Sequence, residues 1–453
     1  MDSVSLTRRT ILGVGLATGV AALSGCGERS AATWTEPSEG NQPPLPAPTS
    51  VGPSPVASAT PTSGADMPAY GHRLVETLSR FLKPTVENPN HPTYAGAAAL
   101  VSVNGSVTVR TAVGDALRYG AGPVELPKGQ RVAMRTDSIF DLASITKVYT
   151  ALLALQQVDR GRVDLAAPVV EYLPGFNGPG KTTITVSMLL AHTSGLRVGA
   201  NVRGLPDDEA RRAAVLATPV IAGESPGRTF RYSSVGLMVL SQLVEKITGE
   251  RLDEALRAGL TRPLGLRDTG FRPFTWLSKA EGAARLVATD ARSSRGLLRG
   301  VVHDEVANML GGIAGHAGVF STVDDVAAVG QMLLNGGELR GKRILGESTV
   351  RRMLTNVNVG LPAIDPDRPG RSSDHGLGVE LNQPWFMGRL ASPQTFGHTG
   401  FTGTSLLVDQ PHRLVFVLLT NRAHPNWSWA NPDPMRAAAA NVLADAIGSN
   451  QLL

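Results

Sequence analysis

Three short motifs, far apart in the chain, contain the residue types of a nucleophilic active site: Ser144-Ile145-Thr146-Lys147, Tyr232-Ser233-Ser234 and His398-Thr399-Gly400. A serine hydroxyl is a weak nucleophile until a neighbouring base takes its proton. Ser144 and Lys147 are three residues apart, so on a helix they lie on one face. Lysine can serve as the base when burial lowers its pKa. The spacing therefore predicts Ser144 as nucleophile and Lys147 as base, although alone it also fits a helix cap and a surface lysine.

The elements around the first two motifs are predicted to be helices. Val148, Leu152 and Leu155 repeat at helical spacing after Ser144, and Gly161 is a plausible end. We expect Asp141 or Ser144 to cap this helix, which places Ser144 near the positive end of the helix dipole. A second helix follows Tyr232, with Gly249 past its end and an apolar face made by Leu237, Leu240, Val244 and Ile247. Without the other motifs, Tyr232 also fits a half-buried packing residue and Ser234 a helix cap.

Two hairpins predict the sheet that completes the site. Residues 96–103 and 106–113 read as strands joined by the tight turn Asn104-Gly105. Near the C-terminus, residues 404–408 and 414–419 form a second hairpin. We expect both hairpins to join one antiparallel sheet, followed by a C-terminal helix at 437–447. The middle of the chain is mostly helical, so the fold class is α+β.

Several further blocks give these motifs a familiar context. They are Phe140-Asp141-Leu142-Ala143 before Ser144, the segment 189–196 (LLAHTSGL), the segment 320–326 (FSTVDDV) and Leu419-Thr420-Asn421-Arg422. From about Leu74 to its C-terminus, the chain resembles the serine β-lactamase-related superfamily, close to class C β-lactamases, low-molecular-weight penicillin-binding proteins and family VIII esterases. The resemblance implies a β-lactamase/transpeptidase-like fold. In that fold an antiparallel sheet is flanked by helices, a mainly helical lobe stands beside it, and the active site lies between them.

The resemblance also implies roles for individual residues. Lys147 and Tyr232 would move protons for the nucleophile Ser144, and the backbone N–H groups of Ser144 and Phe401 would form an oxyanion hole. The third motif would lie on the strand that lines the cleft, with Gly400 allowing substrate to approach the backbone. The expected substrate-binding residues are Ser234, His316, His398, Thr399, Gly400, Asn421 and Arg422.

Two positions depart from the usual family pattern. Ser234 stands where the family usually has asparagine, so one amide contact to substrate is missing. His398 stands where many lactamases have lysine, and a histidine is largely neutral at pH 7. Asn421 or Arg422 would have to compensate for the missing cation. His316 lies in a glycine-rich segment, which either borders the cleft or only forms a tight turn.

The N-terminus reads as an export segment. Residues 1–25 contain Thr7-Arg8-Arg9-Thr10, similar to a twin-arginine motif, and end in a sequence similar to a lipobox before Cys26, the only cysteine. We expect acylation of Cys26, for example with palmitate, and anchoring at the outer face of the cytoplasmic membrane. An unlipidated signal and export by general secretion are the alternatives. Residues 26–67 are rich in Pro, Ser, Thr and Ala and read as a tether, and residues 68–453 as the catalytic domain.

Charge and composition narrow the classes of partner. The formal net charge is +5 over 453 residues, which is mild for this length. No segment has metal-ligand spacing or the basic, aromatic-interleaved pattern of nucleic-acid binding. We therefore expect no cofactor, no metal and no nucleic acid, and a small-molecule or peptidoglycan-peptide substrate. The oligomeric state stays open.

The leading hypothesis is a cell-envelope serine hydrolase that acts through an acyl-enzyme, most simply on D-alanyl peptides. A family VIII-like carboxylesterase and a weak β-lactamase are alternatives within the same chemistry. An alternative of another class is a non-catalytic or slowly acylating lipoprotein that binds the cell wall.

Overall fold

The structure is a computed structural model and describes residues 67–452. The predicted signal segment, Cys26 and nearly all of the predicted tether lie outside the described residues. None of the helices within residues 67–452 combines the length and the apolar character needed to cross a bilayer.

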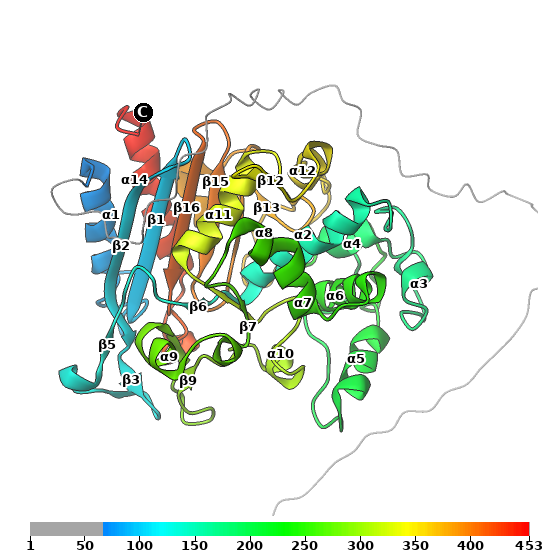
Figure 1. The fold of residues 1–453 in the computed structure, drawn as a ribbon, viewed down its shortest axis with the longest axis horizontal. Coiled ribbons are helices and arrows are strands. Elements are labelled where there is room, and N and C mark those ends of the chain that lie inside the picture. The colour runs from blue at the N-terminus through cyan, green and yellow to red at the C-terminus, as the bar shows by residue number, and fades with distance from the viewer. Residues whose placement is uncertain (1–66, 453) are drawn as a thin grey trace, which may run out of the picture. The chain divides into compact units, whose positions relative to one another are not determined.

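One antiparallel sheet unites the two ends of the described chain (Figure 1). Strand β16 pairs with β1, and β1 pairs with β2, so the first and last hairpins lie side by side as predicted. Strand β2 continues to Leu117, beyond the predicted end at residue 113. The order of the seven strands is β13 (Glu380–Leu381), β14 (Thr395–Thr399), β15 (Ser405–Asp409), β16 (Leu414–Thr420), β1 (Gly96–Val103), β2 (Ser106–Leu117) and β5 (Val132–Ala133).

Helices cover both faces of this sheet. Helices α1 (Ala69–Arg80) and α14 (Asp433–Gly448) share an apolar cluster with β1 and β16 on one face. Helix α11 (Val323–Leu334) packs against β1, β15 and β16 on the other face. Every residue of β1 and β16 is consequently buried, which explains why these strands read as nearly continuous apolar runs.

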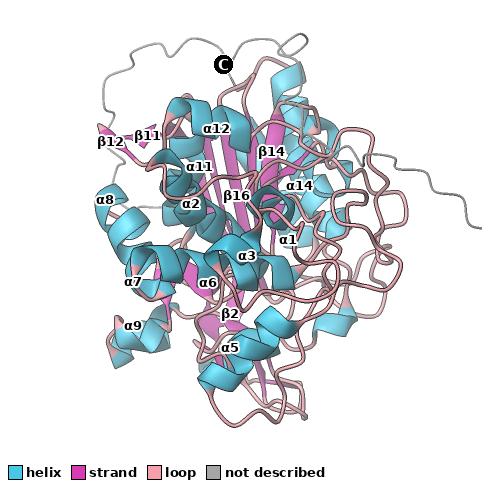
Figure 2. Ribbon diagram, turned by 90° about the vertical axis from the view of Figure 1, so that its right-hand side faces the viewer, coloured by secondary structure: helices cyan, strands magenta, loops and turns pink. Residues whose placement is uncertain are grey.

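A helical lobe stands beside the sheet and surrounds α2 (Thr146–Asp159), whose side chains are mostly buried. Helix α6 (Ser234–Thr248) packs against α2, and α3, α5, α6 and α7 lie below α2 in Figure 2. The other helices are α3 (Val169–Tyr172), α4 (Val186–Leu190), α5 (Asp208–Ala217), α7 (Leu252–Leu256), α8 (Arg262–Leu264), α9 (Lys279–Arg285), α10 (Glu305–Met309), α12 (Glu347–Met353) and α13 (Pro384–Met387).

A small second sheet connects the helical lobe to the nucleophile motif. Strand β10 (Val319–Ser321) lies between β6 (Phe140–Asp141) and β7 (Gly270–Phe271). Strand β6 leads through a short 3₁₀ turn at Ala143–Ile145 into α2. The remaining two-stranded pairs are β3 (Tyr119–Gly120) with β4 (Val124–Glu125), β8 (Ala288–Asp290) with β9 (Leu298–Arg299), and β11 (Glu338–Leu339) with β12 (Lys342–Arg343).

Three local predictions are corrected by the structure. Neither Asp141 nor Ser144 caps α2, because the 3₁₀ turn intervenes and the N-cap residue is Ile145, without a side-chain bond. The C-terminal helix begins at Asp433 and not at residue 437, with a proline in its first turn. In α6 it is Ser233, not Ser234, that accepts the capping hydrogen bond from Gly236 N–H.

Candidate active site

The turn that carries Ser144 is held in a strained backbone conformation. Ala143 has a φ of +46°, in the left-handed region that costs energy for residues other than glycine. Buried Asp141 supports the turn, since its Oδ1 accepts a hydrogen bond from Ala143 N–H at 2.9 Å and its Oδ2 one from His303 N–H at 2.7 Å. Ser144 is the only residue between 141 and 150 that is not fully buried. The strained turn and the packing around it therefore leave the Ser144 side chain accessible while its neighbours are buried.

Lys147 lies beneath Ser144 and is 1% exposed. Its Nζ donates hydrogen bonds to Ser144 Oγ at 3.0 Å and to the His316 carbonyl at 3.1 Å. Burial lowers the pKa of Lys147 to about 7, although the negative charges of Asp304 and Glu380 oppose the shift. A substantial fraction of the amine is therefore neutral near pH 7 and can accept the serine proton.

Tyr232 lies beside Ser144 and Lys147, in the loop that leads into α6. Lys147 Nζ lies 4.9 Å from the centre of its ring. Burial raises the pKa of the Tyr232 hydroxyl, and a hydrogen bond with Ser144 and the charge of Arg371 oppose that rise. The resting hydroxyl is therefore protonated and within reach of the nucleophile, as a proton donor must be.

The loop after His398-Thr399-Gly400 packs against the backbone that precedes Ser144. Thr402 Oγ1 donates to the Asp141 carbonyl at 2.8 Å, and Thr404 Oγ1 to the Leu142 carbonyl at 2.9 Å. A Cβ on Gly400 would lie 2.3 Å from the Leu142 carbonyl oxygen, so only glycine fits this contact. Within residues 67–452, the N–H groups of Ser144 and Phe401 donate to no other protein group. Two free donors thus stand on segments in mutual contact, which is the arrangement that an oxyanion hole requires.

His398 is buried on β14, beside Tyr232, with ring centres 6.3 Å apart. Its Nδ1 lies 2.8 Å from the Thr399 carbonyl, and because a carbonyl only accepts, the proton is on Nδ1. Burial lowers the pKa of His398 to about 3, and the charge of Lys147 lowers it further in the same direction. The third motif consequently places no cation in the site at neutral pH.

The glycine-rich segment around His316 borders the site, which resolves the alternative left open by the sequence. Besides the bond from Lys147 to its carbonyl, the His316 ring donates from Nε2 to Asp304 Oδ1 at 2.9 Å. Burial would raise the pKa of Asp304, but the hydrogen bond and charge of His316 outweigh it and hold the pKa below its usual range. Sequence reasoning missed Asp304 and Glu380 as charges that act on Lys147, because no local pattern indicates their distance from it.

Of the other predicted binding residues, Ser234 and Arg422 remain candidates for substrate contact, and Asn421 does not. Ser234 is half-buried at the start of α6, and its hydroxyl bonds to no other residue among 67–452. Arg422 stacks its guanidinium 4.7 Å from the Phe401 ring centre and donates to the Phe401 carbonyl. The prediction that Asn421 binds substrate is wrong. Its Oδ1 accepts from Ala95 and Gly96 N–H, and its Nδ2 donates to the Asp115 carbonyl. Asn421 is fully buried and ties strands together, so it has no group left for a substrate.

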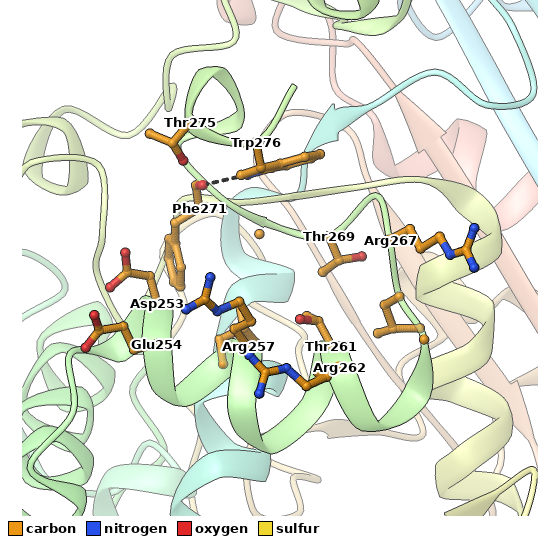
Figure 3. Close-up of a pocket in the computed structure, with 14 residues that line it drawn as sticks. Asp253, Glu254, Arg257, Thr261, Arg262, Arg267, Thr269, Phe271, Thr275 and Trp276 are labelled. Atoms are coloured by element: carbon orange, nitrogen blue, oxygen red, sulfur yellow. Dashed lines mark hydrogen bonds between the residues drawn. The ribbon is translucent and has the colours of Figure 1, made fainter. Parts of the chain in front are cut away.

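A surface pocket shown in Figure 3 lies elsewhere in the fold. It is formed by α7, α8 and the segment between them, with Phe271 and Trp276 on the opposite wall. Trp276 Nε1 donates to the Phe271 carbonyl at 2.8 Å. None of the three motifs contributes a lining residue, and no His, Cys, Asp or Glu group within the described residues is arranged to hold a metal ion.

Comparison with known protein families assigns the chain to one of them. The family model described as Beta-lactamase matches residues 79–441. The chain belongs to the beta-lactamase family. Proteins of the same superfamily named as carboxypeptidases, esterases and β-lactamases are among its relatives, and the chain is a serine hydrolase of this superfamily.

Two kinds of relative illustrate the membership. A protein of Escherichia coli K12 named "Putative D-alanyl-D-alanine carboxypeptidase" is 32% identical over 365 residues, which cover 73% of this chain and 79% of the relative. A penicillin-binding protein homologue from Caulobacter crescentus has a TM-score of 0.60 at 19% identity, covering 84% of this chain and 98% of that one. A family VIII carboxylesterase has a TM-score of 0.61 at 20% identity, with the same two coverages. These two structures share the fold and confirm the predicted α+β architecture.

Proposed function

We propose that the protein is a cell-envelope serine hydrolase that forms an acyl-enzyme on Ser144 and acts on D-alanyl peptides. The observation that carries this proposal is the 3.0 Å contact between Lys147 Nζ and Ser144 Oγ, with a lysine pKa of about 7. The contact matches what nucleophilic catalysis requires of a serine and its base. The substrate class rests on the names of the relatives that are about 30% identical.

In the proposed reaction, neutral Lys147 takes the proton from Ser144 Oγ while the oxygen attacks the substrate carbonyl. The N–H groups of Ser144 and Phe401 stabilise the negative oxygen that develops. Tyr232 gives its proton to the departing amine, and the proton on Lys147 then restores the tyrosine hydroxyl. Water hydrolyses the ester on Ser144 in a second addition and elimination, which returns the hydroxyl and releases the acid.

A carboxylesterase is the second candidate, and His398 favours it. A neutral histidine provides no fixed charge for the carboxylate that D-alanyl peptides and β-lactams carry. An ester lacks that carboxylate and loses nothing from this substitution. The half-buried hydroxyl of Ser234, in place of an amide, acts in the same direction.

We further propose that Cys26 is acylated and that the segment after it holds the catalytic domain at the outer face of the cytoplasmic membrane. The twin-arginine-like motif, the apolar run and the single cysteine support this. The test is to grow cells that produce the full chain with a fatty-acid probe and to measure incorporation of the probe into the wild type and into Cys26→Ala. The proposal predicts label in the membrane fraction for the wild type and none on Cys26→Ala. An unlabelled wild type would contradict the anchor.

Intact-mass measurement after incubation with a penicillin tests the catalytic proposal directly. We expect a covalent adduct on the wild type and none on Ser144→Ala. A wild type that gives no adduct but consumes the penicillin would be a β-lactamase. A wild type that neither binds nor consumes penicillin, but hydrolyses p-nitrophenyl acetate through Ser144, would favour the esterase. An equal adduct on Ser144→Ala would refute Ser144 as the nucleophile.

A further inference from the structure

A buried arginine on α14, Arg436, donates hydrogen bonds to the loop 400–404, which carries the Phe401 N–H. Arg436 lies on α14 and is 3% exposed. Its Nη2 donates to the Gly400 carbonyl at 2.7 Å and to the Thr404 carbonyl at 3.1 Å. Its Nη1 pairs with Asp433 at 3.0 Å. Burying an arginine is costly unless its bonds compensate, so this side chain is a specific feature of the site and not a solvated charge.

The Gly400 carbonyl and the Phe401 N–H belong to the same peptide bond. In a planar trans peptide, the oxygen and the hydrogen point in opposite directions. Holding the oxygen toward Arg436 therefore directs the hydrogen away from α14. The same loop contacts Leu142 and Ala143, immediately before Ser144.

Neighbouring bonds hold other groups of this loop, and the Phe401 N–H is left without an acceptor among residues 67–452. Gly400 N–H donates to the Thr404 carbonyl at 2.8 Å, and Gly403 N–H to the Gly400 carbonyl at 3.0 Å. The Phe401 carbonyl accepts from Arg422, and the Gly403 carbonyl from Thr420 Oγ1. Among residues 67–452, nothing accepts from the Phe401 N–H.

From this arrangement we infer that Arg436 is a positioning residue of the oxyanion hole, which fixes the Gly400–Phe401 peptide so that Phe401 N–H faces the reacting carbonyl. A charged donor on the peptide oxygen also polarises the peptide and strengthens its N–H as a donor. The inference deepens the proposed acyl-enzyme function and depends on it. Arg436 itself does not touch the substrate.

The charge needed for this role persists at neutral pH. Burial lowers the pKa of Arg436, Asp433 opposes that shift, and the resulting value of about 10 leaves the guanidinium cationic. Arg368 shares the same carboxylate, since its Nε donates to Asp433 Oδ2 at 2.8 Å, but it has no bond to residues 400–404. Arg368 is therefore a matched control for the loss of one positive charge beside Asp433.

The test compares Arg436→Met, Arg436→Lys and Arg368→Met with the wild type, each produced as the full chain. The first measurement is the second-order rate constant of acylation by a penicillin, with p-nitrophenyl acetate as a second acyl donor. The second is the infrared stretching frequency of the ester carbonyl in the acyl-enzyme, which falls when the oxyanion hole donates to it. Thermal unfolding establishes that each variant is folded.

We expect Arg436→Met to be acylated about 10- to 100-fold more slowly than the wild type. This reduction is no larger than the one caused by removing an oxyanion-hole donor. Its ester band should move to higher frequency, which a merely structural role would not cause in a folded variant. Arg436→Lys keeps the cation with a different reach and should show an intermediate rate and band. Arg368→Met should behave like the wild type in both measurements.

A folded Arg436→Met with wild-type acylation and an unshifted ester band would overturn the inference. If Arg436→Met does not fold, Arg436→Lys decides, and a wild-type band in that variant would overturn it equally. An effect of the same size in Arg368→Met would mean that charge near Asp433, not the bond to Gly400, is responsible. A wild type that acylates with neither donor would overturn the proposed function as well, so the two failures are distinguishable.

Discussion

Lys147 Nζ donates to Ser144 Oγ at 3.0 Å, and its other protein acceptor is the His316 carbonyl at 3.1 Å. No carboxylate among residues 67–452 lies within hydrogen-bond distance of this lysine, although Asp304 and Glu380 act on it from further away. The site thus keeps two opposing influences in balance: burial favours the neutral amine, and distant negative charge favours the ammonium. The resulting pKa of about 7 lies near neutral pH. A general base is most effective when its pKa lies near the pH of the reaction.

The pH dependence of acylation should follow Lys147. Because the lysine must be neutral to accept a proton and its pKa is about 7, kcat/KM should rise between pH 6 and pH 8 and then level off. Lys147→Met should lower kcat/KM by about 10³-fold and abolish the rise. Lys181→Met, at another lysine with a lowered pKa, is the control. A profile that is flat from pH 6 to 8 in the wild type would contradict the assigned base.

Asp304 should set the position of that pH profile. Its negative charge raises the pKa of Lys147, so Asp304→Asn should lower this pKa and move the rising limb to lower pH. Asparagine is an equally good helix cap, so the bond to Ala307 N–H at the start of α10 survives the change. Glu305→Gln alters the next residue, an exposed one, and should leave the limb in place. A limb that moves to higher pH in Asp304→Asn would reverse the proposed sign.

The Tyr232 hydroxyl should contribute to turnover and not to folding. Tyr232→Phe keeps the ring that faces Lys147 and removes only the proton donor, so kcat should fall by about 10²- to 10³-fold. Tyr94→Phe removes a buried hydroxyl that donates to the Leu78 carbonyl, in the apolar cluster that α1 and α14 share with β1 and β16. That control should lose some stability and keep its kcat. A Tyr232→Phe variant with wild-type kcat would assign proton delivery to another group.

The parts of this fold that the sequence predicted are those with strong local signals. Helices α2 and α6 follow from apolar spacing, and both hairpins follow from strand runs joined by short turns. Predicted boundaries were wrong where one residue fits two structures. Helix α14 starts at Asp433, earlier than the predicted residue 437, because Pro434 is compatible with a first helical turn. The strained φ of Ala143 has no signature in the sequence, since alanine is not a residue type that indicates it.

The site was predictable at its motifs and not at the contacts between them. Ser144, Lys147 and Tyr232 come from segments whose residue types carry the chemistry. Arg436 and Glu380 act through long-range packing, and nothing in the residues around them indicates that neighbourhood. Asn421 shows the opposite error: the family resemblance of the segment 419–422 suggested substrate contact, but its amide bonds to the ends of β1 and β2.

Asn421→Ala should therefore lower stability more than activity. The change leaves two N–H groups and one carbonyl without their partner, each at a cost of about 1–3 kcal/mol when buried. We expect the free energy of unfolding in urea to fall by roughly 3 kcal/mol or more. KM of the folded fraction should stay near its wild-type value. Asn426→Ala, in a loop with local bonds only, should cost much less, and a raised KM without loss of stability in Asn421→Ala would restore a binding role.

An exposed aromatic pair beside the free Phe401 N–H should select substrates with apolar acyl groups. Phe401 is 45% exposed and Trp427 38%, with ring centres 5.7 Å apart, and His303 contacts the Phe401 ring from another side at 5.3 Å. An apolar group that covers these rings would gain about 1.5 kcal/mol, or about tenfold in kcat/KM. Trp427→Ala should thus lower kcat/KM for a phenylacetyl ester about tenfold and for an acetyl ester less than twofold. Phe274→Ala, which removes an exposed aromatic ring outside this pair, should leave kcat/KM unchanged for both esters. Equal losses for both esters in Trp427→Ala would mean that the pair supports the loop and does not contact the acyl group.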